Sequence, residues 1–299
     1  LSLQTIHTTG YTSRFTNLGK TSNRGVEVSV ESRNIVKPKF GWTTSFTLSH
    51  NKQMVDDIGH EEYVSCLESG GNTNYMMYGY KTGYPLNALW GFQYAGVWKT
   101  TDQFERNRFT KSYISSSTGS DAQLMLGYPK YVDQNRDGIL SEEDLIYLGN
   151  SDPVLYGGLQ NTFNIGGLRI GFYFSYSLGG KFYDLYTQRA VDLAGYSDNV
   201  PTAAADKWSP SNQNAVYQGV GNASEYASSR FVSKRNTLSL ASLRIGYAFP
   251  KRIASAMRMQ ALKVSLTCDD LWYSSSVKSP RSLYYPYATS FILSLQATF

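Results

Sequence analysis

The residues best suited to chemistry lie in the twelve-residue stretch 133–144, where acidic and amide side chains recur at alternate positions. Asp133, Asn135 and Asp137 take positions 1, 3 and 5 of the pattern D-x-[DN]-x-[DN]-G, and the glycine that follows allows a sharp turn. Calcium is a hard cation that needs several converging oxygen atoms, and this spacing supplies them. The sequence therefore predicts a structural calcium site with the ligands Asp133, Asn135, Asp137, Ile139 (through its carbonyl), Ser141 and Asp144.

Two features separate this stretch from a calcium sensor. Its last position is Asp144 instead of the glutamate that binds bidentately, so the shorter side chain reaches less far. The flanking residues 128–131 and 145–149 have the composition of extended segments instead of helices. The alternative interpretation is a turn rich in Asp, Asn and Gly that holds no metal.

Nothing in the sequence favours catalysis or binding to nucleic acid. His7, His50 and His60 show neither triad nor metal-ligand spacing. The 28 Lys and Arg residues against 23 Asp and Glu residues give a net charge of +5, which is spread without a basic block. We therefore expect neither an enzyme nor a nucleic-acid-binding protein.

The pattern of apolar residues along the chain predicts the strands that hold the loop 133–144 in place. Tyr, Phe and Trp make up 14% of the chain, and apolar side chains recur at every second position in several segments. That period places one set of side chains on each face of a strand. The sequence therefore predicts an all-β chain with seven long strands near 21–33, 40–48, 155–165, 168–178, 237–249, 262–267 and 289–299, and with Leu1–Ile6 as the tail of an eighth.

The connections between these strands alternate between short and long. The short links are residues 34–39, 166–167 and 250–259, and the long excursions are 50–153, 179–236 and 269–289. This sorting is typical of an antiparallel outer-membrane β-barrel, with short turns on one side and long loops on the other. A soluble β-sandwich shows the same alternation along its strands but has no reason to sort its connections. No apolar run reaches the roughly 18 residues of a membrane-spanning helix, so a helical membrane protein is excluded.

Strand parity then assigns the two sides of the barrel. If the chain ends at the periplasmic face, every short link falls on that side and every long excursion lies outside the cell. We therefore expect two long extracellular loop regions, 51–153, which contains the calcium-type loop 133–144, and 180–236. A short helix is expected at 183–193 in the second region.

Stretches in a fixed order along the chain carry a family resemblance. They are Thr21–Val30, Trp42–Asn51, Asp133–Asp144, Gly149–Pro153, Tyr156–Phe163, Phe174–Lys181, Leu238–Pro250 and the closing strand. Together they resemble the C-terminal portion of SusC/RagA-type TonB-dependent outer-membrane transporters of the Bacteroidota. The chain departs from the family pattern at Asp270-Leu271-Trp272 and at 237–242, which affects the choice of subfamily.

The resemblance implies the C-terminal part of a 22-stranded antiparallel transmembrane β-barrel whose lumen holds an N-terminal plug domain. It implies a place in the bacterial outer membrane, contact with the lipid bilayer, and uptake of oligosaccharides or peptides with energy delivered through TonB. A SusD-like surface lipoprotein would cap the barrel. The plug, a signal sequence and a TonB-engaging segment are not among the 299 residues, so we expect a fragment or one part of a split or nicked protein.

The resemblance also suggests a role for the aromatic residues of the first long loop. Flat rings with a polar handle stack on sugars and anchor lids, so contact with the ligand or the lipoprotein is expected for Tyr80, Tyr84, Trp90, Tyr94 and Trp98. The alternative is that these rings pack the loop onto itself or lie in the aromatic girdle at the membrane interface.

Other interpretations stay open from the residues alone. A calcium-stabilised soluble or surface β-rich glycan-binding module is the main alternative function. An outer-membrane barrel enzyme would need a Ser, His and acid set that faces the lumen, and none is evident. Eight strands are also enough to close a small barrel, although the long outer loops disfavour it.

Overall fold

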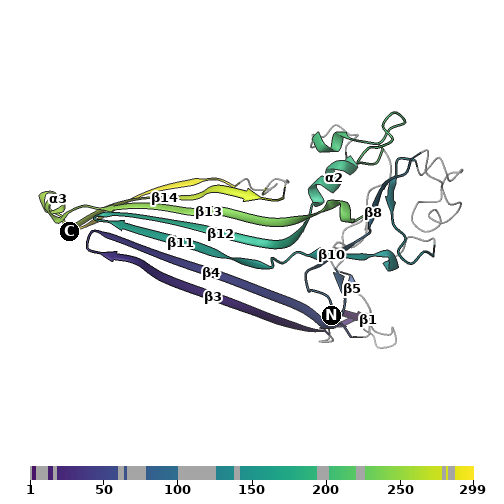
Figure 1. Ribbon diagram of the computed structural model, residues 1–299, viewed down its shortest axis with the longest axis horizontal. Helices are drawn as coiled ribbons and strands as arrows, with labels where there is room; N and C mark the ends of the chain where they lie inside the picture. The colour runs from purple at the N-terminus through teal and green to yellow at the C-terminus, as the bar shows by residue number, and fades with distance from the viewer. Residues whose placement is uncertain are drawn as a thin grey trace. The chain divides into compact units, whose positions relative to one another are not determined.

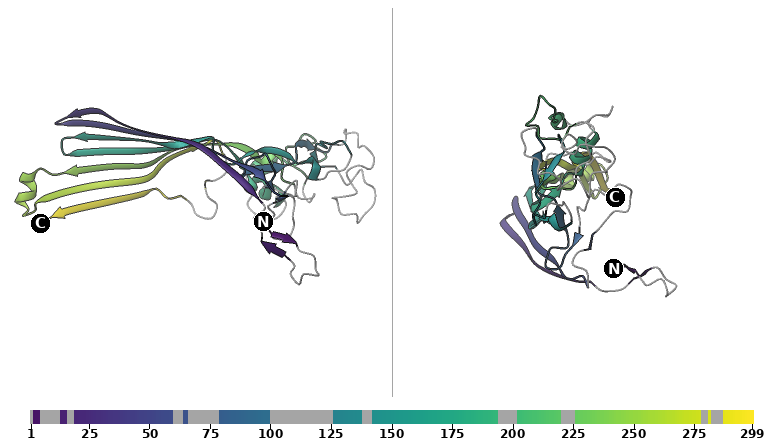
Figure 2. Two further views of the ribbon diagram at one scale, coloured as in Figure 1. Left: turned by 90° about the horizontal axis from the view of Figure 1, so that it is seen from below. Right: turned by 90° about the vertical axis from the view of Figure 1, so that its right-hand side faces the viewer.

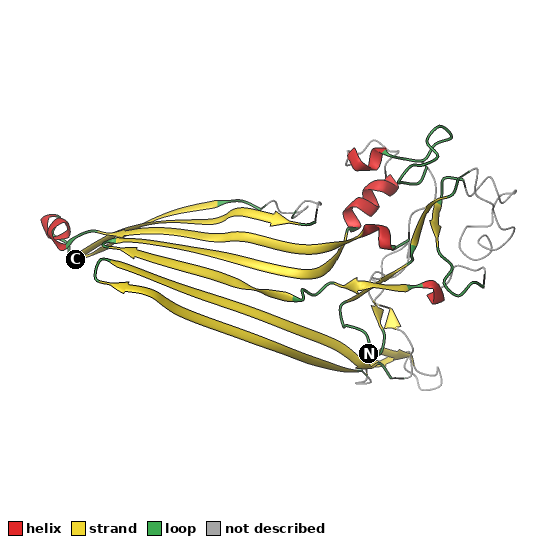
Figure 3. Cartoon of the chain, in the orientation of Figure 1, coloured by secondary structure: helices red, strands yellow, loops and turns green. Residues whose placement is uncertain are grey.

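The computed structural model describes residues 2–4, 13–15, 19–59, 64–65, 79–99, 126–137, 142–193, 202–219, 226–277, 281 and 287–299. Strands dominate this part of the chain, as Figure 3 shows. It divides into two compact units. The sheet unit comprises Asn23–Lys52, Asp152–Gly180 and Lys234–Phe299, and the loop unit comprises Leu1–Ser22, Gln53–Ser151 and Lys181–Ser233. Among the described residues, no helix has the length and hydropathy needed to cross a membrane.

The sheet unit is built on seven long strands in the spatial order β15-β14-β13-β12-β11-β4-β3 (Figure 1). The strands are β3 (Lys20–Lys37), β4 (Phe40–Asp57), β11 (Leu155–Ile165), β12 (Leu168–Tyr183), β13 (Val232–Ala248), β14 (Ala261–Ser275) and β15 (Ser290–Thr298). The pairs β4–β11, β11–β12, β13–β14 and β14–β15 are antiparallel. All seven predicted strands are present, and several are longer than predicted. β3 and β15 form the two edges and do not pair with each other, so the sheet is open (Figure 2).

The three short links lie at one end of the sheet, the end that also carries the C-terminus (Figure 1). Residues 38–39 join β3 to β4, Gly166 and Gly167 join β11 to β12, and helix α3 (Lys251–Ala256) lies between β13 and β14. The Gly166–Gly167 turn is hydrogen-bonded on both sides: Gly166 N donates to Lys39 O of the link beside it (3.0 Å), and Ala248 N at the end of β13 donates to Gly167 O (2.8 Å). Gly166 has a φ of +58°, which a two-residue hairpin turn requires and glycine adopts readily. The predicted short links are therefore confirmed.

Period-two alternation gives the sheet two chemically different faces. The apolar face includes Phe46, Leu48, Leu159, Phe163, Ile170, Phe174, Leu243, Ile245, Val264, Leu266, Phe291, Leu293 and Leu295. The polar face includes Thr43, Ser45, Thr47, Gln160, Thr162, Arg169, Tyr173, Arg244, Lys263, Ser265, Thr267, Ser294 and Gln296. Each register pair joins residues of the same face, so the sorting is continuous from strand to strand.

The apolar face is most exposed at the edge strand β15, whereas most of its other residues named above are half-buried. The side chains of Phe291, Leu293 and Leu295 on β15 have exposed fractions of 66%, 74% and 71%. Apolar surface in contact with water costs roughly 25 cal/mol per Å², and a continuous row of this kind is unusual on a soluble monomer. This face therefore needs an apolar environment that the described residues do not supply.

One polar network lies on the apolar face. Asn161 Oδ1 accepts hydrogen bonds from Trp42 Nε1 (2.8 Å) and Thr44 Oγ1 (2.6 Å), and Thr44 Oγ1 accepts one from Asn34 Nδ2 (2.7 Å). The Trp42 ring stacks on Phe163 with a centroid distance of 5.7 Å. Because polar groups in an apolar environment are costly unless they are hydrogen-bonded, these mutual contacts make the network compatible with that face.

The prediction for the N-terminus was wrong. We expected Leu1–Ile6 to continue the large sheet as the tail of an eighth strand. Instead, β1 (Ser2–Gln4) pairs with β2 (Ser13–Phe15) in a separate two-stranded sheet. Closing a short loop to a nearby partner costs less chain entropy than joining a distant strand, which favours the local hairpin.

The loop unit contains short strands and a few helical turns. Its strands after β2 are β5 (Val64–Ser65), β6 (Gly79–Tyr80), β7 (Ala88–Gly91), β8 (Tyr94–Val97), β9 (Pro129–Tyr131) and β10 (Ile146–Asn150). Its helices are α2 (Leu185–Leu193) and the 3-10 turns η2 (Glu142–Asp144), η3 (Thr202–Ala205) and η4 (Ser229–Phe231). β5 pairs with β6, β7 with β10 and β8 with β9. Helix α2 confirms the helix predicted at 183–193.

The two long excursions fold together in this unit. Phe92 N donates to Ala227 O (2.8 Å), and Ser229 N donates to Phe92 O (2.9 Å). A buried cluster joins both segments through Leu89, Tyr183, Ala227 and Phe231. Segments that are far apart in the sequence therefore share one small core.

Substitution Asn161→Ala tests the polar network. It removes the acceptor of Trp42 and Thr44, so we expect a loss of about 1–3 kcal/mol in the free energy of unfolding, measured by urea titration. Asn164→Ala on the same strand is the matched control, because Asn164 is exposed and lies on the polar face. Equal effects of the two substitutions would contradict a structural role for the network.

Candidate functional site

The described part of the calcium-type loop forms consecutive side-chain-to-backbone turns. Asp133 Oδ1 accepts a hydrogen bond from Arg136 N (2.6 Å), and Asn135 Oδ1 accepts one from Asp137 N (3.0 Å). Strand β9 precedes the loop, the 3-10 turn η2 forms its last three residues, and β10 follows it, so its flanks lack the long helices of a sensor. Two predicted ligands, Ile139 and Ser141, lie outside the described residues.

Oxygen atoms gather around Asn135. Its Nδ2 donates to Asp137 Oδ2 (3.1 Å) and to Glu143 Oε2 (2.9 Å), so both carboxylates approach one amide group. Asp144 is fully buried, and its Oδ1 accepts a hydrogen bond from Gln134 N (2.8 Å). In the described part of the chain, no three His, Cys, Asp or Glu side chains gather closely enough to hold a metal ion. The structure therefore brings together an incomplete oxygen-rich set.

Glu143 is the member of this set that sequence reasoning missed. Its side chain is exposed to solvent and also accepts a hydrogen bond from Asn135. No spacing rule for position 11 of the loop would have found it. The 3-10 turn η2 brings Glu143 back toward Asn135.

The predicted aromatic contacts divide into buried and half-buried rings. Trp90 and Trp98 have exposed fractions of 3% and 8%, whereas Tyr80, Tyr84 and Tyr94 are half-buried. Trp90 Nε1 donates to Gly79 O (3.1 Å), and its ring lies 4.8 Å from that of Tyr84. The two tryptophans therefore contact protein neighbours, and the three tyrosines keep part of their surface accessible.

Tyr147 completes the cluster around Trp90. Its ring lies 5.9 Å from Trp90 and 5.4 Å from Tyr84. Burial, followed by the nearby Tyr84, raises the pKa of Tyr147 above its ordinary value of 10.0. Because the folded chain favours the neutral phenol, this contribution to stability is present below the unfolded pKa and is lost as the pH rises through the folded pKa.

A second aromatic cluster holds the two excursions together. Phe92 and Tyr131 are buried against each other with a centroid distance of 5.5 Å, and Tyr226 packs beside both rings. The Arg230 guanidinium lies 4.6 Å from the Tyr94 ring and 3.9 Å from the Tyr217 ring. These cation–π contacts join residues of both excursions.

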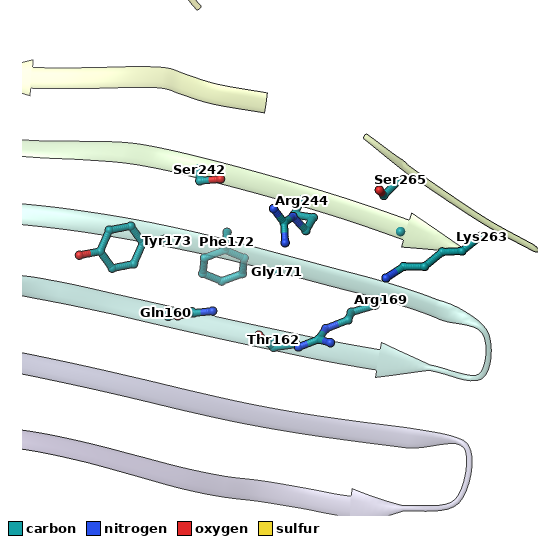
Figure 4. Close-up of a pocket in the computed structure, with 11 residues that line it drawn as sticks. Gln160, Thr162, Arg169, Gly171, Phe172, Tyr173, Ser242, Arg244, Lys263 and Ser265 are labelled. Atoms are coloured by element: carbon teal, nitrogen blue, oxygen red, sulfur yellow. The ribbon is translucent and has the colours of Figure 1, made fainter. Parts of the chain in front are cut away.

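The sheet unit contains a separate polar recess of about 290 Å³. Figure 4 shows its lining residues, which come from β11, β12, β13 and β14 and, apart from Phe172, lie on the polar face. Three of them are basic: Arg169, Arg244 and Lys263. The sequence alone does not reveal this recess, because the three residues are scattered along the chain and only the strand register brings them together.

Substitution Trp90→Ala tests the aromatic core of the loop unit. Loss of a buried tryptophan costs about 3–5 kcal/mol, so we expect the segment 79–99 to become accessible to protease at lower denaturant concentration. Val216→Ala is the control, because Val216 is 52% exposed in the same unit. Unchanged proteolysis of Trp90→Ala would show that this tryptophan does not stabilise the unit.

Comparison with known proteins finds similarity to TonB-dependent receptors. No protein-family model matches it. TonB-dependent receptor P26 of Formosa agariphila is 28% identical over 249 residues, which cover 81% of this chain and 23% of the relative. TonB-dependent receptor P3 of the same species is 24% identical over 264 residues, covering 88% and 25%. TonB-dependent receptor SusC of Bacteroides thetaiotaomicron is 23% identical over 242 residues, covering 78% and 21%.

Solved structures of RagAB are similar to this chain in fold. The structure of the RagAB peptide transporter matches with a TM-score of 0.72 and 17% identity, covering 99% of this chain and 31% of that chain. The RagAB peptide importer in its open-open state matches with a TM-score of 0.73 and 17% identity, covering 100% and 31%. The chain thus spans about a quarter of the curated relatives and about a third of the solved chains. The predicted resemblance to a fragment of a SusC/RagA-type receptor is confirmed.

Proposed function

We propose that this chain, which resembles SusC/RagA-type TonB-dependent receptors over most of its length, is the C-terminal part of an outer-membrane nutrient importer. One observation carries the proposal. The seven-stranded sheet has one apolar and one polar face, in a chain that is similar to these receptors. A barrel wall between lipid and an aqueous lumen requires this division.

The strand lengths support a membrane-spanning wall. A tilted strand needs about 9–11 residues to cross the hydrocarbon region. β3 and β4 have 18 residues each, and β12 has 16, so all three are long enough to cross and to extend beyond it. Lipid would then cover the row Phe291, Leu293 and Leu295, and the polar face would line the lumen.

The two edges of the sheet indicate that further strands belong to the complete barrel. In lipid, backbone N–H and C=O groups at an open edge would have no partner. β3 and β15 are therefore proposed to pair with strands from the rest of the same barrel. The plug would occupy the lumen, and TonB would engage an N-terminal segment beyond this sequence.

The loop unit would provide the extracellular surface. We propose that it contacts a SusD-like surface lipoprotein and part of the ligand, which would be an oligosaccharide or a peptide. Tyr80, Tyr84 and Tyr94 are the best-placed rings for such contact because part of each side chain is accessible. Trp90 and Trp98 would support them from within the unit, since both are buried.

The alternative function, a calcium-stabilised glycan-binding module in water, leaves the apolar face unexplained. Such a module would bury the row Phe291, Leu293 and Leu295 against protein, whereas these side chains are mostly exposed in the described structure. Enzymatic activity is also not proposed, because the relatives with which this chain aligns are named as receptors.

Charge placed on alternate faces of β15 tests the proposal. An arginine on the lipid face of a barrel costs about 2–4 kcal/mol at the bilayer midplane, whereas a lumen position tolerates it. In the complete protein, we expect Leu293→Arg to lower the amount of folded protein in the outer-membrane fraction, and Ser294→Arg to leave it nearly unchanged.

Equal tolerance of both substitutions would contradict a lipid-facing role for Leu293. The same conclusion would follow if the unmodified complete protein stayed monodisperse in buffer without detergent. That second result would favour the soluble module.

We also propose that the loop 133–144 binds calcium and stabilises the loop unit. Asp133, Asn135, Asp137 and Asp144 supply hard oxygen atoms, Glu143 adds another, and Ile139 and Ser141 are the remaining expected ligands. The five carboxylates of this stretch, Glu142 among them, repel one another, and a divalent cation would offset that repulsion.

Calcium binding to the complete protein can be measured by equilibrium dialysis. We expect Asp133→Ala to weaken binding at least about tenfold, because it removes a charged first-position ligand. Glu27→Gln is the control, since Glu27 is an exposed carboxylate of β3 in the sheet. Binding that Asp133→Ala leaves unchanged, or no binding in the unmodified protein, would overturn this proposal.

A further inference from the structure

The recess on the polar face is not used by any part of the function proposed above. Among its lining residues are the basic side chains Arg169, Arg244 and Lys263, and the polar side chains Gln160, Thr162 and Tyr173 (Figure 4). The basic residues belong to three neighbouring strands, β12, β13 and β14. Whether these three basic side chains lie close together therefore depends on the register of the sheet.

The register explains how the basic groups meet. Ala248 N, at the end of β13, donates to Gly167 O, next to the start of β12. Counting along the two antiparallel strands from this pair places Arg169 opposite Gly246, and Gly171 opposite Arg244. On the next strand, Lys263 pairs with Ala248. Diagonal neighbours on adjacent strands lie within reach of long side chains, so the two guanidinium groups and the ammonium group face one small region.

Two glycines leave that region open. Gly171 and Gly246 both line the recess, and neither has a positive φ. A Cβ atom built on Gly171 would lie 3.7 Å from its nearest neighbour, and one on Gly246 would lie 3.5 Å away, which are ordinary van der Waals contacts. The backbone therefore does not require glycine at either position, and the missing side chains keep space free between the basic groups.

The basic groups have no acidic partner within the described chain. Arg244 Nε donates to the neutral Thr267 Oγ1 (3.3 Å), and no salt bridge to Arg169, Arg244 or Lys263 occurs among the described residues. Asp269, the acidic residue on the same face of β14, lies opposite Ser242 and accepts a hydrogen bond from Ser290. Three like charges around an open space repel one another, and an anion between them would relieve that repulsion.

We propose that this recess binds a carboxylate group in the barrel lumen. The proposal rests on the proposed function, which makes the polar face the lumen wall. A guanidinium group presents parallel N–H donors that match the two oxygens of a carboxylate, and Lys263 adds a third charge. The carboxylate has two possible sources: an Asp or Glu side chain from the rest of the protein, or a solute that passes through the lumen.

The test uses the complete protein in detergent and succinate as the probe. The variants are the double substitution Arg169→Gln with Arg244→Gln, which removes two charges, and Gly171→Leu, which fills the recess and keeps every charge. Lys251→Gln is the matched control, because Lys251 is an exposed cation of α3 that does not line the recess. Succinate affinity is measured by calorimetry, and proteolysis of the N-terminal part of the protein is followed in parallel.

Each source predicts a different pattern. For a solute site, the unmodified protein binds succinate, and both recess variants weaken binding at least about tenfold while the control does not. For an internal carboxylate, the unmodified protein does not bind succinate, and the N-terminal part is cleaved at least about tenfold faster only in the recess variants. Either pattern supports the proposal.

The proposal is overturned if the recess variants match the control in both measurements. That result would leave the importer assignment intact, because the importer assignment is tested by a different experiment. The arginine substitutions at Leu293 and Ser294 test which face of the sheet contacts lipid. Conversely, equal tolerance of arginine at those two positions would remove the importer assignment without deciding whether the recess binds succinate.

Discussion

The alternation of apolar and polar side chains along paired strands is the constraint on which this structure depends. Successive side chains on a strand point to opposite faces, so a one-residue slip in register would move every apolar side chain to the polar face. The observed register keeps leucine opposite leucine and serine opposite serine between β14 and β15. That same register also brings the basic residues of β12, β13 and β14 to one recess.

The remaining architecture follows from how the strands are connected. Short turns fix neighbouring strands in register at one end, where the Gly166–Gly167 turn is hydrogen-bonded to Lys39 and to Ala248. The long excursions are free of that constraint, and their buried backbone groups must find partners elsewhere. They do so by pairing with each other, as the contacts between Phe92 and residues 227–229 show. A loop unit with its own small core is the result.

Aromatic residues serve different purposes in the two units. In the sheet they contribute to the apolar face, where Trp42 also donates to Asn161. In the loop unit Trp90 and Phe92 are buried, and Phe92 forms a small core with Tyr131. Composition alone does not distinguish these roles, because an aromatic side chain can lie against lipid, in a protein core or against a ligand.

The sequence by itself determined the seven strands, the short links and the helix at 183–193, because period two and turn residues are local properties. It also identified the resemblance to TonB-dependent receptors. Only the tertiary structure decided that Ser2–Gln4 pairs outside the large sheet, that Trp90 and Trp98 are buried, and that Glu143 approaches Asn135. It alone also revealed the recess formed by Arg169, Arg244 and Lys263. The recess and the burial of the tryptophans depend on contacts between residues far apart in the chain, whereas the other two outcomes depend on how a short loop closes. A period-two pattern carries no information about either.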